Sequence, residues 1–265
     1  MALPIRSRIA PTPSGFLHLG NAFNFQLTAS LTRQFQGQLL LRIDDLDAPR
    51  IRTEYLQDIF ESLDWLGIRI DAGPRNMDEQ LQQYAQQFRL ANYQELLDKL
   101  VIEKRVFGCD CSRKEIQAVS PEGHYPGTCR DKHLPLDTPD ITWRFRTEAN
   151  DLVNWRDGIL GLQEVSVQEV NPDFIIRRRD GLPAYHIASL SDDISYGINL
   201  IVRGEDLRES TAAQLLLAST LKLDAFLNAR FYHHPLLVDA QGNKLSKSKE
   251  ANSLMSLRSG MSGGK

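Results

Sequence analysis

Three features are scarce in this sequence: cysteines, long apolar runs and net charge. Three cysteines in 265 residues are too few for the disulfide framework of a small secreted protein. No stretch approaches the roughly 18 consecutive apolar residues of a membrane-spanning helix, and the N-terminus lacks the basic segment and apolar core of a signal peptide. A net charge of -3 argues against nucleic-acid binding through overall charge. We therefore expect a cytoplasmic protein with no membrane partner, whose contacts with any RNA come from local basic patches.

The first half of the chain has the periodicity of an α/β core. With 42% hydrophobic residues, the chain can bury one sizeable core, alone or with a smaller insertion. Residues 7–10 predict a strand, and apolar residues spaced four apart over 23–35 predict a helix after a turn-rich loop. The apolar run 39–43 predicts a buried parallel strand that leads into the acidic segment 44–47. Carboxylates at that end of a strand lie where open α/β sheets bind ligands.

The pattern changes near residue 107. From there to about 136 the periodicity vanishes, and Cys, Gly, Pro and His accumulate, which indicates a small inserted module. A Ser-, Gly- and Met-rich segment after residue 250 predicts a flexible tail. The other predicted elements are helices at 56–66, 79–105 and 209–223 and strands at 141–145, 174–177 and 200–203.

The loop between the first predicted strand and helix, 11–21, suits a phosphate group. A glycine lets the backbone approach phosphate closely, a helix N-terminus supplies free N–H groups, and an imidazole can donate to a phosphate oxygen. His18, Gly20 and Asn21 are therefore candidate catalytic residues. Taken alone, the motif is explained equally well by a polar loop that caps a helix.

A second candidate motif is the segment 244–248, with the sequence KLSKS, which follows a Gly-containing turn. Lys244 and Lys247 can reach the phosphates of ATP as pyrophosphate leaves, without either acting as a base. The alternative interpretation is a solvated basic loop.

The inserted module carries a candidate metal site. Cys109, Cys111 and Cys129 offer three thiolates, and the phenolic oxygen of Tyr125 can complete a tetrahedral zinc site in a module too small to hold itself together. His124 is the alternative fourth ligand on general grounds, because imidazole is the commoner choice. Three ordinary core cysteines are the remaining explanation, which the low apolar content of the segment disfavours.

Taken together, these motifs resemble a known family. The pairing of the early His-Leu-Gly-Asn with the later lysine segment resembles the signature of class I aminoacyl-tRNA synthetases. Four segments are similar to the glutamyl branch of that class, in the right order over nearly the whole chain: 8–20 (RIAPTPSGFLHLG), 41–47 (LRIDDLD), 180–185 (DGLPAY) and 201–206 (IVRGED). The cysteine module and the missing C-terminal half point further, to the glutamyl-queuosine tRNA(Asp) synthetases, which resemble the catalytic part of glutamyl-tRNA synthetase.

The resemblance implies a reaction, its cofactors and a fold. It implies that a monomer activates glutamate with ATP and Mg²⁺ to glutamyl-adenylate, without needing tRNA, and transfers it to the queuosine wobble base of tRNA(Asp). It favours Tyr125 as the fourth ligand of one structural zinc per chain. We expect a doubly wound, Rossmann-like α/β nucleotide-binding domain with an inserted zinc-binding module. The expected division is two catalytic halves at 1–100 and 137–250, the insertion at 101–136 and a flexible tail at 251–265.

The resemblance also implies site residues, position by position. For glutamate these are Arg8 on the side-chain carboxylate, Ala10 and Thr12 beside it, Asp44 facing the ammonium, Tyr185 closing over the amino acid and Arg203 contacting a carboxylate. For ATP they are His18, Gly20, Lys244 and Lys247. Two positions depart from the family, which usually has serine at Thr12 and glutamate at Asp44.

Two other functions stay open on the sequence. One is a truncated glutamyl-tRNA synthetase that charges tRNA(Glu), although the chain continues too briefly after Ser248 for an anticodon-binding domain. The other is a catalytically silent paralogue that binds RNA or a protein. Such a paralogue is expected to have lost phosphate-contacting residues, whereas His18, Gly20, Lys244 and Lys247 are all present.

Overall fold

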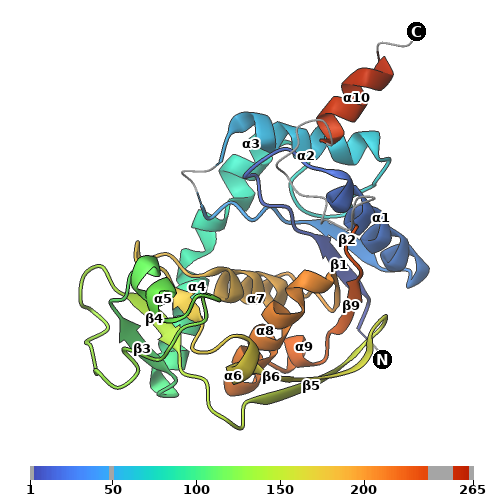
Figure 1. The fold of residues 1–265 in the computed structure, drawn as a ribbon. Coiled ribbons are helices and arrows are strands. Elements are labelled where there is room, and N and C mark those ends of the chain that lie inside the picture. Colours follow the sequence, from blue (N-terminus) through green and yellow to red (C-terminus); the bar gives the residue numbers. More distant parts are fainter. Residues whose placement is uncertain (1–2, 48–50, 238–252, 263–265) are drawn as a thin grey trace. The chain divides into compact units, whose positions relative to one another are not determined.

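The chain forms a mixed α/β, Rossmann-like structure made of two units that interleave along the sequence. The computed structural model describes residues 3–47, 51–237 and 253–262 (Figure 1). Unit 1 comprises Met1–Arg89, Ile198–Asp206 and Ala229–Lys265, and unit 2 comprises Leu90–Gly197 and Leu207–Asn228. Among the described residues, no helix is both long and apolar enough to span a bilayer.

Unit 1 is built on parallel strands in the order β2-β1-β8-β9. Its elements are β1 (Arg6–Ile9), α1 (Leu19–Gln34), β2 (Gln38–Leu41), α2 (Thr53–Trp65), α3 (Met77–Glu79), the π-helical turn η2 (Gln80–Tyr84), the 3₁₀ turn η3 (Gln86–Arg89), β8 (Leu200–Gly204), β9 (Arg230–His234) and α10 (Leu254–Ser262). The pairs Arg6 with Gln38 and Ser7 with Leu200 set the register of β1 against its two neighbours. The predicted strand, helix and strand at the start of the chain are thus confirmed.

A hydrophobic core holds the strands of unit 1 against its helices. Helix α1 packs on β1, β2 and β8, and its buried face includes Phe25. Ile9, Leu41 and Ile59 from three other elements join the same cluster, and each is almost fully buried. Burial of one such side chain contributes about 1.5–3 kcal/mol. The loop that follows β1 therefore starts from a rigid base.

The predicted single helix over 79–105 is wrong in its first third. The chain forms η2, is extended at Ala85 (ψ 140°), forms η3, and only then enters α4 (Leu90–Ile102). The cause lies in the acidic segment after β2, because the carboxylate of Asp45 accepts hydrogen bonds from the Gln86 backbone N–H (2.8 Å) and the Gln80 side chain (2.7 Å). A backbone N–H that serves a carboxylate is not available to a helical carbonyl.

The predicted tail also differs, because residues 254–262 form α10. Leu254 is fully buried (0% exposed), belongs to the core of unit 1, and has Leu257 packed beside the same cluster. Helix α10 contacts α2. Two leucines one turn apart thus give this Ser- and Gly-rich segment an apolar stripe, and composition alone concealed it.

Unit 2 combines a three-stranded antiparallel sheet, β3-β4-β7, with a hairpin and a group of helices. Its elements are α4, β3 (Val106–Cys109), α5 (Arg113–Val119), β4 (Thr142–Phe145), the hairpin strands β5 (Leu152–Asp157) and β6 (Gly161–Ser166), α6 (Val167–Val170), β7 (Ile175–Arg177), α7 (Tyr185–Ser195), α8 (Arg208–Thr220) and α9 (Asp224–Leu227). The 3₁₀ turn η4 (Glu205–Leu207) precedes α8. The sequence did not predict the hairpin or α7.

The cysteine segment is more regular than the sequence predicted. It contains β3 and α5, and β3 pairs along its whole length with β4, which lies beyond residue 136. The sheet that carries Cys109 thus extends past the predicted end of the module. The division into an insertion and two catalytic halves, and a sheet wound doubly with helices, stay predictions.

Candidate active site and cysteine cluster

His18 caps the N-terminus of α1. Its Nδ1 accepts a hydrogen bond from the Gly20 backbone N–H (3.1 Å), and Asn21 Oδ1 accepts one from the His18 N–H (3.0 Å). Because Nδ1 is an acceptor, the neutral ring carries its proton on Nε2 and can donate from there. The capping interpretation of this motif is therefore correct, and the cap fixes which ring nitrogen carries the proton.

Gly20 is required by the folded-back imidazole. A Cβ atom placed on Gly20 would lie 2.9 Å from His18 Cε1, closer than real Cβ atoms come to a neighbour, and 3.0 Å from Nδ1, which is a tight contact. The glycine thus allows the ring to cover the positive end of the helix, where an anion is stabilised.

Arg8 and Arg203 lie on neighbouring parallel strands, β1 and β8. Both are buried, with 4% and 3% of their surface exposed. Arg8 Nη1 lies 3.5 Å from the Val202 carbonyl oxygen, which places its guanidinium against β8. Two buried positive charges on adjacent strands suit a negatively charged ligand, since a guanidinium binds a carboxylate through two charge-assisted hydrogen bonds.

Asp44 reaches the same loop from the next strand. Its backbone N–H donates to the Pro11 carbonyl (2.9 Å), which ties the acidic segment to the residues after β1. Its carboxylate forms a two-point ion pair with Arg42, at 2.7 Å to Nε and 3.1 Å to Nη2. The predicted contact of Asp44 with an ammonium would therefore compete with a neighbouring arginine, which the sequence did not reveal.

The remaining predicted glutamate residues are distributed over both units. Ala10 is half-buried and Thr12 is exposed, and both lie in the loop after β1. Tyr185 is exposed, begins α7 in unit 2, and its ring makes an edge contact with His186. The predicted closure of Tyr185 over an amino acid stays a prediction.

Lys244 and Lys247 lie outside the described residues, but the chain just after them is anchored at His18. Ser253 forms an antiparallel bridge with His18, and the Leu254 N–H donates to the Leu17 carbonyl (2.7 Å). The loop that carries His18 is thus joined directly to the chain at Ser253 and Leu254.

Asp58 is a buried carboxylate that contacts the loop before His18, and the sequence analysis did not single it out. It lies in α2, is 2% exposed, and accepts a hydrogen bond from the Leu17 backbone N–H (2.9 Å). The signal was present, because Asp58 sits within the apolar stripe of an amphipathic helix, where a carboxylate is costly unless it is paired.

The three cysteines form one cluster in unit 2. Their sulfur atoms lie within 4.8 Å of one another, and those of Cys111 and Cys129 are 3.3 Å apart. A tetrahedral zinc with bonds of about 2.3 Å needs sulfur atoms roughly 3.8 Å apart, so the cluster fits such an ion after small adjustments. The predicted convergence of Cys109, Cys111 and Cys129 is confirmed.

Tyr125 is placed to complete the cluster, whereas His124 is not. The Tyr125 hydroxyl accepts the Cys129 backbone N–H (2.8 Å) and hydrogen-bonds the Cys109 side chain, and its ring is buried with both cysteines. His124 is exposed. Between the two alternatives, the geometry favours a phenolic oxygen as the fourth ligand.

The electrostatics of the cluster differ from one thiol to the next. Burial raises the pKa of Cys109, but hydrogen bonds from Tyr125 and Arg144 outweigh it and lower the pKa to about 7. Burial raises the pKa of Cys111 to about 12, assisted by Cys129 and by the negative charge of Cys109. Burial also raises the pKa of Tyr125. Neighbouring thiolates repel one another, and a divalent cation bound between them would offset this repulsion.

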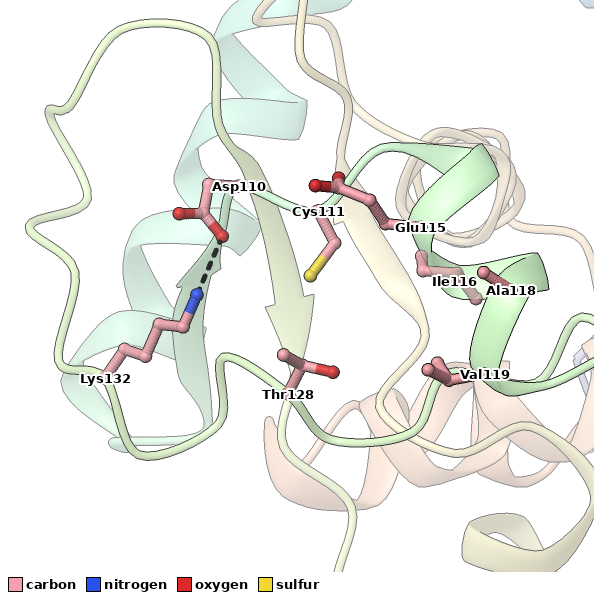
Figure 2. Close-up of a pocket in the computed structure, with 8 residues that line it drawn as sticks. All are labelled: Asp110, Cys111, Glu115, Ile116, Ala118, Val119, Thr128 and Lys132. Atoms are coloured by element: carbon pink, nitrogen blue, oxygen red, sulfur yellow. Dashed lines mark hydrogen bonds and ion pairs between the residues drawn. The ribbon is translucent and has the colours of Figure 1, made fainter.

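Cys111 also borders an open pocket of about 500 Å³. Figure 2 shows its sulfur pointing toward Thr128, on the side away from helix α5, while the Glu115 side chain reaches across from α5. Across the opening, Lys132 Nζ lies 3.3 Å from Asp110 Oδ1. The cluster is therefore buried on one side and reachable from solvent on the other.

Comparison with known proteins gives this arrangement a context. Residues 4–259 match the family described as tRNA synthetases class I (E and Q), catalytic domain. A glutamyl-Q tRNA(Asp) synthetase from Nitratidesulfovibrio vulgaris is 36% identical over 96% of this chain and 81% of that protein. A glutamate–tRNA ligase from Burkholderia multivorans is 32% identical over 97% of this chain, which spans 55% of the ligase.

A solved structure agrees with these relatives. The crystal structure of a glutamate–tRNA synthetase from Elizabethkingia anophelis superposes with a TM-score of 0.78 at 26% identity, over 92% of this chain and 53% of that one. The described fold is thus similar to about half of a glutamate–tRNA synthetase.

Proposed function

The chain belongs to the catalytic-domain family of class I tRNA synthetases (E and Q), and on that premise we propose that it activates glutamate with ATP and transfers it to the queuosine base of tRNA(Asp). The observation that carries the proposal is the bridge between His18 and Ser253. It joins the loop of the first motif to the chain that follows the second, as a single ATP site requires. Because tRNA is the acceptor, we place the reaction in the cytoplasm. That the enzyme acts as a monomer stays a prediction.

In the first step, an α-carboxylate oxygen of glutamate attacks the α-phosphorus of ATP. The bond from that phosphorus to the bridging oxygen breaks, so glutamyl-adenylate and pyrophosphate form. His18 Nε2 and the N-terminus of α1 offer donors to phosphate oxygens, and Lys244 and Lys247 stabilise charge on the departing pyrophosphate. Mg²⁺ bound to ATP would neutralise part of the phosphate charge. In the second step, a hydroxyl of the acceptor attacks the activated carbonyl and AMP leaves.

The glutamate pocket is assigned to residues around the carboxyl ends of β1, β2 and β8. Arg8 would bind the side-chain carboxylate of glutamate, and Arg203 would contact a carboxylate as well. The burial of both arginines on adjacent strands supports this assignment. Asp44 would face the ammonium, through a water or after loosening its pair with Arg42. Ala10 and Thr12 would line the pocket, and closure by Tyr185 stays a prediction.

The cysteine cluster would hold a structural zinc through Cys109, Cys111, Cys129 and Tyr125. The fit of the three sulfur atoms to a tetrahedral ion supports this assignment. The metal would supply cross-links between β3, the loop at Tyr125 and Cys129. No step of the reaction needs it.

The choice of acceptor rests on the relatives. The chain is 36% identical to a glutamyl-Q tRNA(Asp) synthetase and spans 81% of it, against 32% identity and 55% of a glutamate–tRNA ligase. The second candidate function is the charging of tRNA(Glu), which the similarity to a glutamate–tRNA synthetase structure favours.

ATP–pyrophosphate exchange tests the proposal. We expect exchange with glutamate in the absence of tRNA, and transfer of labelled glutamate to tRNA(Asp) only when that tRNA carries queuosine. Aspartate and glutamine serve as controls for the amino acid, and unmodified tRNA(Asp) and tRNA(Glu) for the acceptor. Exchange that appears only with tRNA(Glu) would favour the second function. No exchange under any condition would refute both and support a silent paralogue.

A further inference from the structure

Unit 1 buries a carboxylate that the proposed reaction does not use. Asp58 lies in α2, 2% exposed, and Leu56 and Ile59 on the same helix belong to the core. A carboxylate in such surroundings must be compensated by hydrogen bonds or charge. Its partners therefore indicate why the residue is there.

Each oxygen of Asp58 has a separate partner. Oδ2 accepts the backbone N–H of Leu17 at 2.9 Å. Oδ1 accepts Nη1 of Arg258, from helix α10, at 3.0 Å, and the Ser62 hydroxyl donates weakly to the same oxygen (3.4 Å). One carboxylate thus joins the residue before His18 to the C-terminal helix.

Helix α10 holds Leu17 a second time. The Leu254 N–H donates to the Leu17 carbonyl at 2.7 Å, so both backbone polar groups of Leu17 are fixed. Leu17 and Leu254 lie together in the core cluster, with 3% and 0% exposure. The peptide planes on either side of Leu17 cannot rotate without breaking one of these contacts.

We propose that Asp58 and Arg258 are positioning residues for the ATP site, acting through Leu17 on His18. The proposal rests on the function proposed above, since it assigns His18 to ATP. Arg258 orients the Asp58 carboxylate, the carboxylate fixes the Leu17 N–H, and His18 then presents Nε2 and the start of α1 to the phosphates. Helix α10, which the sequence predicted as a tail, thereby becomes part of the machinery of adenylation.

The alternative is that the Arg258–Asp58 pair only anchors α10. The two roles differ in what a substitution changes. An anchor affects stability and lowers all activities together, whereas a positioning residue affects the step that uses His18. Displacement of a reacting group by about 1 Å can reduce the rate roughly 100-fold even when the substitution is remote.

The variant Arg258→Gln removes the charge of Arg258 and keeps a polar side chain. We expect kcat/KM for ATP in pyrophosphate exchange to fall about 10- to 100-fold, with the KM for glutamate within about twofold of the parent. Arg258→Lys, which retains the charge without the fork, is expected to recover part of the loss. Asp58→Asn is expected to act in the same direction, and the double variant should lose less than the two single losses combined.

Glu61→Gln is the matched control. Glu61 is exposed and contacts the other terminal nitrogen of Arg258 (Nη2, 2.8 Å), so its loss leaves the Asp58 contact in place. We expect its kinetics to equal those of the parent. Equal losses in Glu61→Gln and Arg258→Gln would overturn the proposal.

Amide hydrogen exchange provides a second readout that needs no activity. The peptide that contains Leu17 is expected to exchange faster in Arg258→Gln than in the parent or Glu61→Gln, with Leu254 affected alongside it. Unchanged exchange, or a proportional loss for ATP and glutamate together with a lower melting temperature, would overturn the positioning role. A parent protein that is inactive in pyrophosphate exchange would instead refute the proposed function. The hydrogen-exchange data would still decide whether these contacts hold Leu17. If Asp58→Asn does not fold, the two Arg258 variants carry the test.

Discussion

The His18 loop and the cysteine cluster are held in shape by different means. The loop stands on a core that draws large side chains from β1, β2, α1, α2 and α10. The cluster has a core of only Phe107, Cys109, Tyr125 and Cys129, flanked by few half-buried residues. Arginines cover its aromatic rings: Arg144 Cζ lies 3.7 Å from the centre of the Tyr125 ring, and Arg146 lies over Phe107. Burial shapes the first region, whereas polar and sulfur contacts shape the second.

This difference predicts which kind of change affects each region most. In the first region a substitution at one side chain is expected to alter chemistry while the core keeps the fold. In the second, removal of the metal is expected to alter the fold while chemistry elsewhere continues. The predictions below follow from this contrast and are ordered by their expected effect on adenylation.

The largest effect is expected for Arg8→Gln. A neutral amide cannot replace a two-point, charge-assisted contact to the glutamate side chain at a buried position. Loss of a buried charged hydrogen bond costs on the order of 2 to 5 kcal/mol, so kcat/KM for glutamate should fall roughly 30-fold to several thousand-fold in pyrophosphate exchange.

Arg52→Gln is the control for Arg8→Gln, because Arg52 is an exposed arginine of the same unit. Its kinetics should match those of the parent. Amino-acid selection by the parent is the decisive companion measurement, given Thr12 and the pairing of Asp44 with Arg42. If the parent activates aspartate or glutamine in preference to glutamate, the assignment of glutamate as substrate is wrong, although activation with ATP is still supported.

Lys247→Ala is expected to have the next largest effect. Its charge matters most as negative charge develops on pyrophosphate, so kcat should fall about 100- to 1,000-fold while glutamate binding changes little. Steady-state exchange kinetics with each substrate varied in turn provide the measurement. An unchanged kcat with a raised KM for glutamate would show that Lys247 contacts glutamate rather than ATP, and the assignment would be wrong.

Gly20→Ala separates activity from stability. The added methyl group displaces the His18 ring, so kcat/KM for ATP should fall about 10-fold. The variant should be as stable as the parent, since alanine in a helix is favoured over glycine by about 1 kcal/mol. Thermal melting and exchange kinetics on the same preparation test both halves, and a fully active Gly20→Ala would show that the folded-back ring is not needed.

Zinc removal is expected to have the smallest effect on adenylation and a large one on the stability of unit 2. Elemental analysis should find about one zinc per chain. A variant with all three cysteines changed to serine should bind none and lose about 4 kcal/mol of stability, the value for free zinc at 1,000 times its Kd. If the parent as purified contains no zinc and the triple variant melts at the same temperature as that parent, the site does not exist.

Two single variants identify the fourth zinc ligand. Tyr125→Phe should weaken zinc binding, whereas His124→Ala should leave it unchanged, because Tyr125 faces the thiols and His124 is exposed. The ring stacking of Arg144 survives in Tyr125→Phe, so a loss there reports on the hydroxyl. The opposite pattern would reverse the assignment.

Sequence patterns predicted the local parts of this structure well. The strand predicted at 39–43, observed as β2, and the convergence of Cys109, Cys111 and Cys129 followed from apolar runs and spacing. Such features depend on neighbours along the chain.

Most of the failures involve partners distant in sequence. The break at Ala85 depends on Asp45, and α10 depends on a core assembled from the first 70 residues. The pair of Asp44 with Arg42 was close in sequence, but only its side-chain geometry distinguishes it from a ligand-facing carboxylate. The proposed role of Asp58 follows only from its contacts with both Leu17 and Arg258, which are distant from it in sequence.

The position of β1 between β2 and β8 has a consequence during synthesis on the ribosome. Ser7 and its partner Leu200 are 193 residues apart, and translation at about 5–20 residues per second separates their appearance by roughly 10–40 s. During that interval β1 can pair only with β2, and the long segment Leu90–Gly197 of unit 2 is completed first. Newly made chains thus close the nucleotide-binding sheet last, an order that refolding from denaturant does not impose. We therefore expect refolding of intact chains to give lower yields than synthesis.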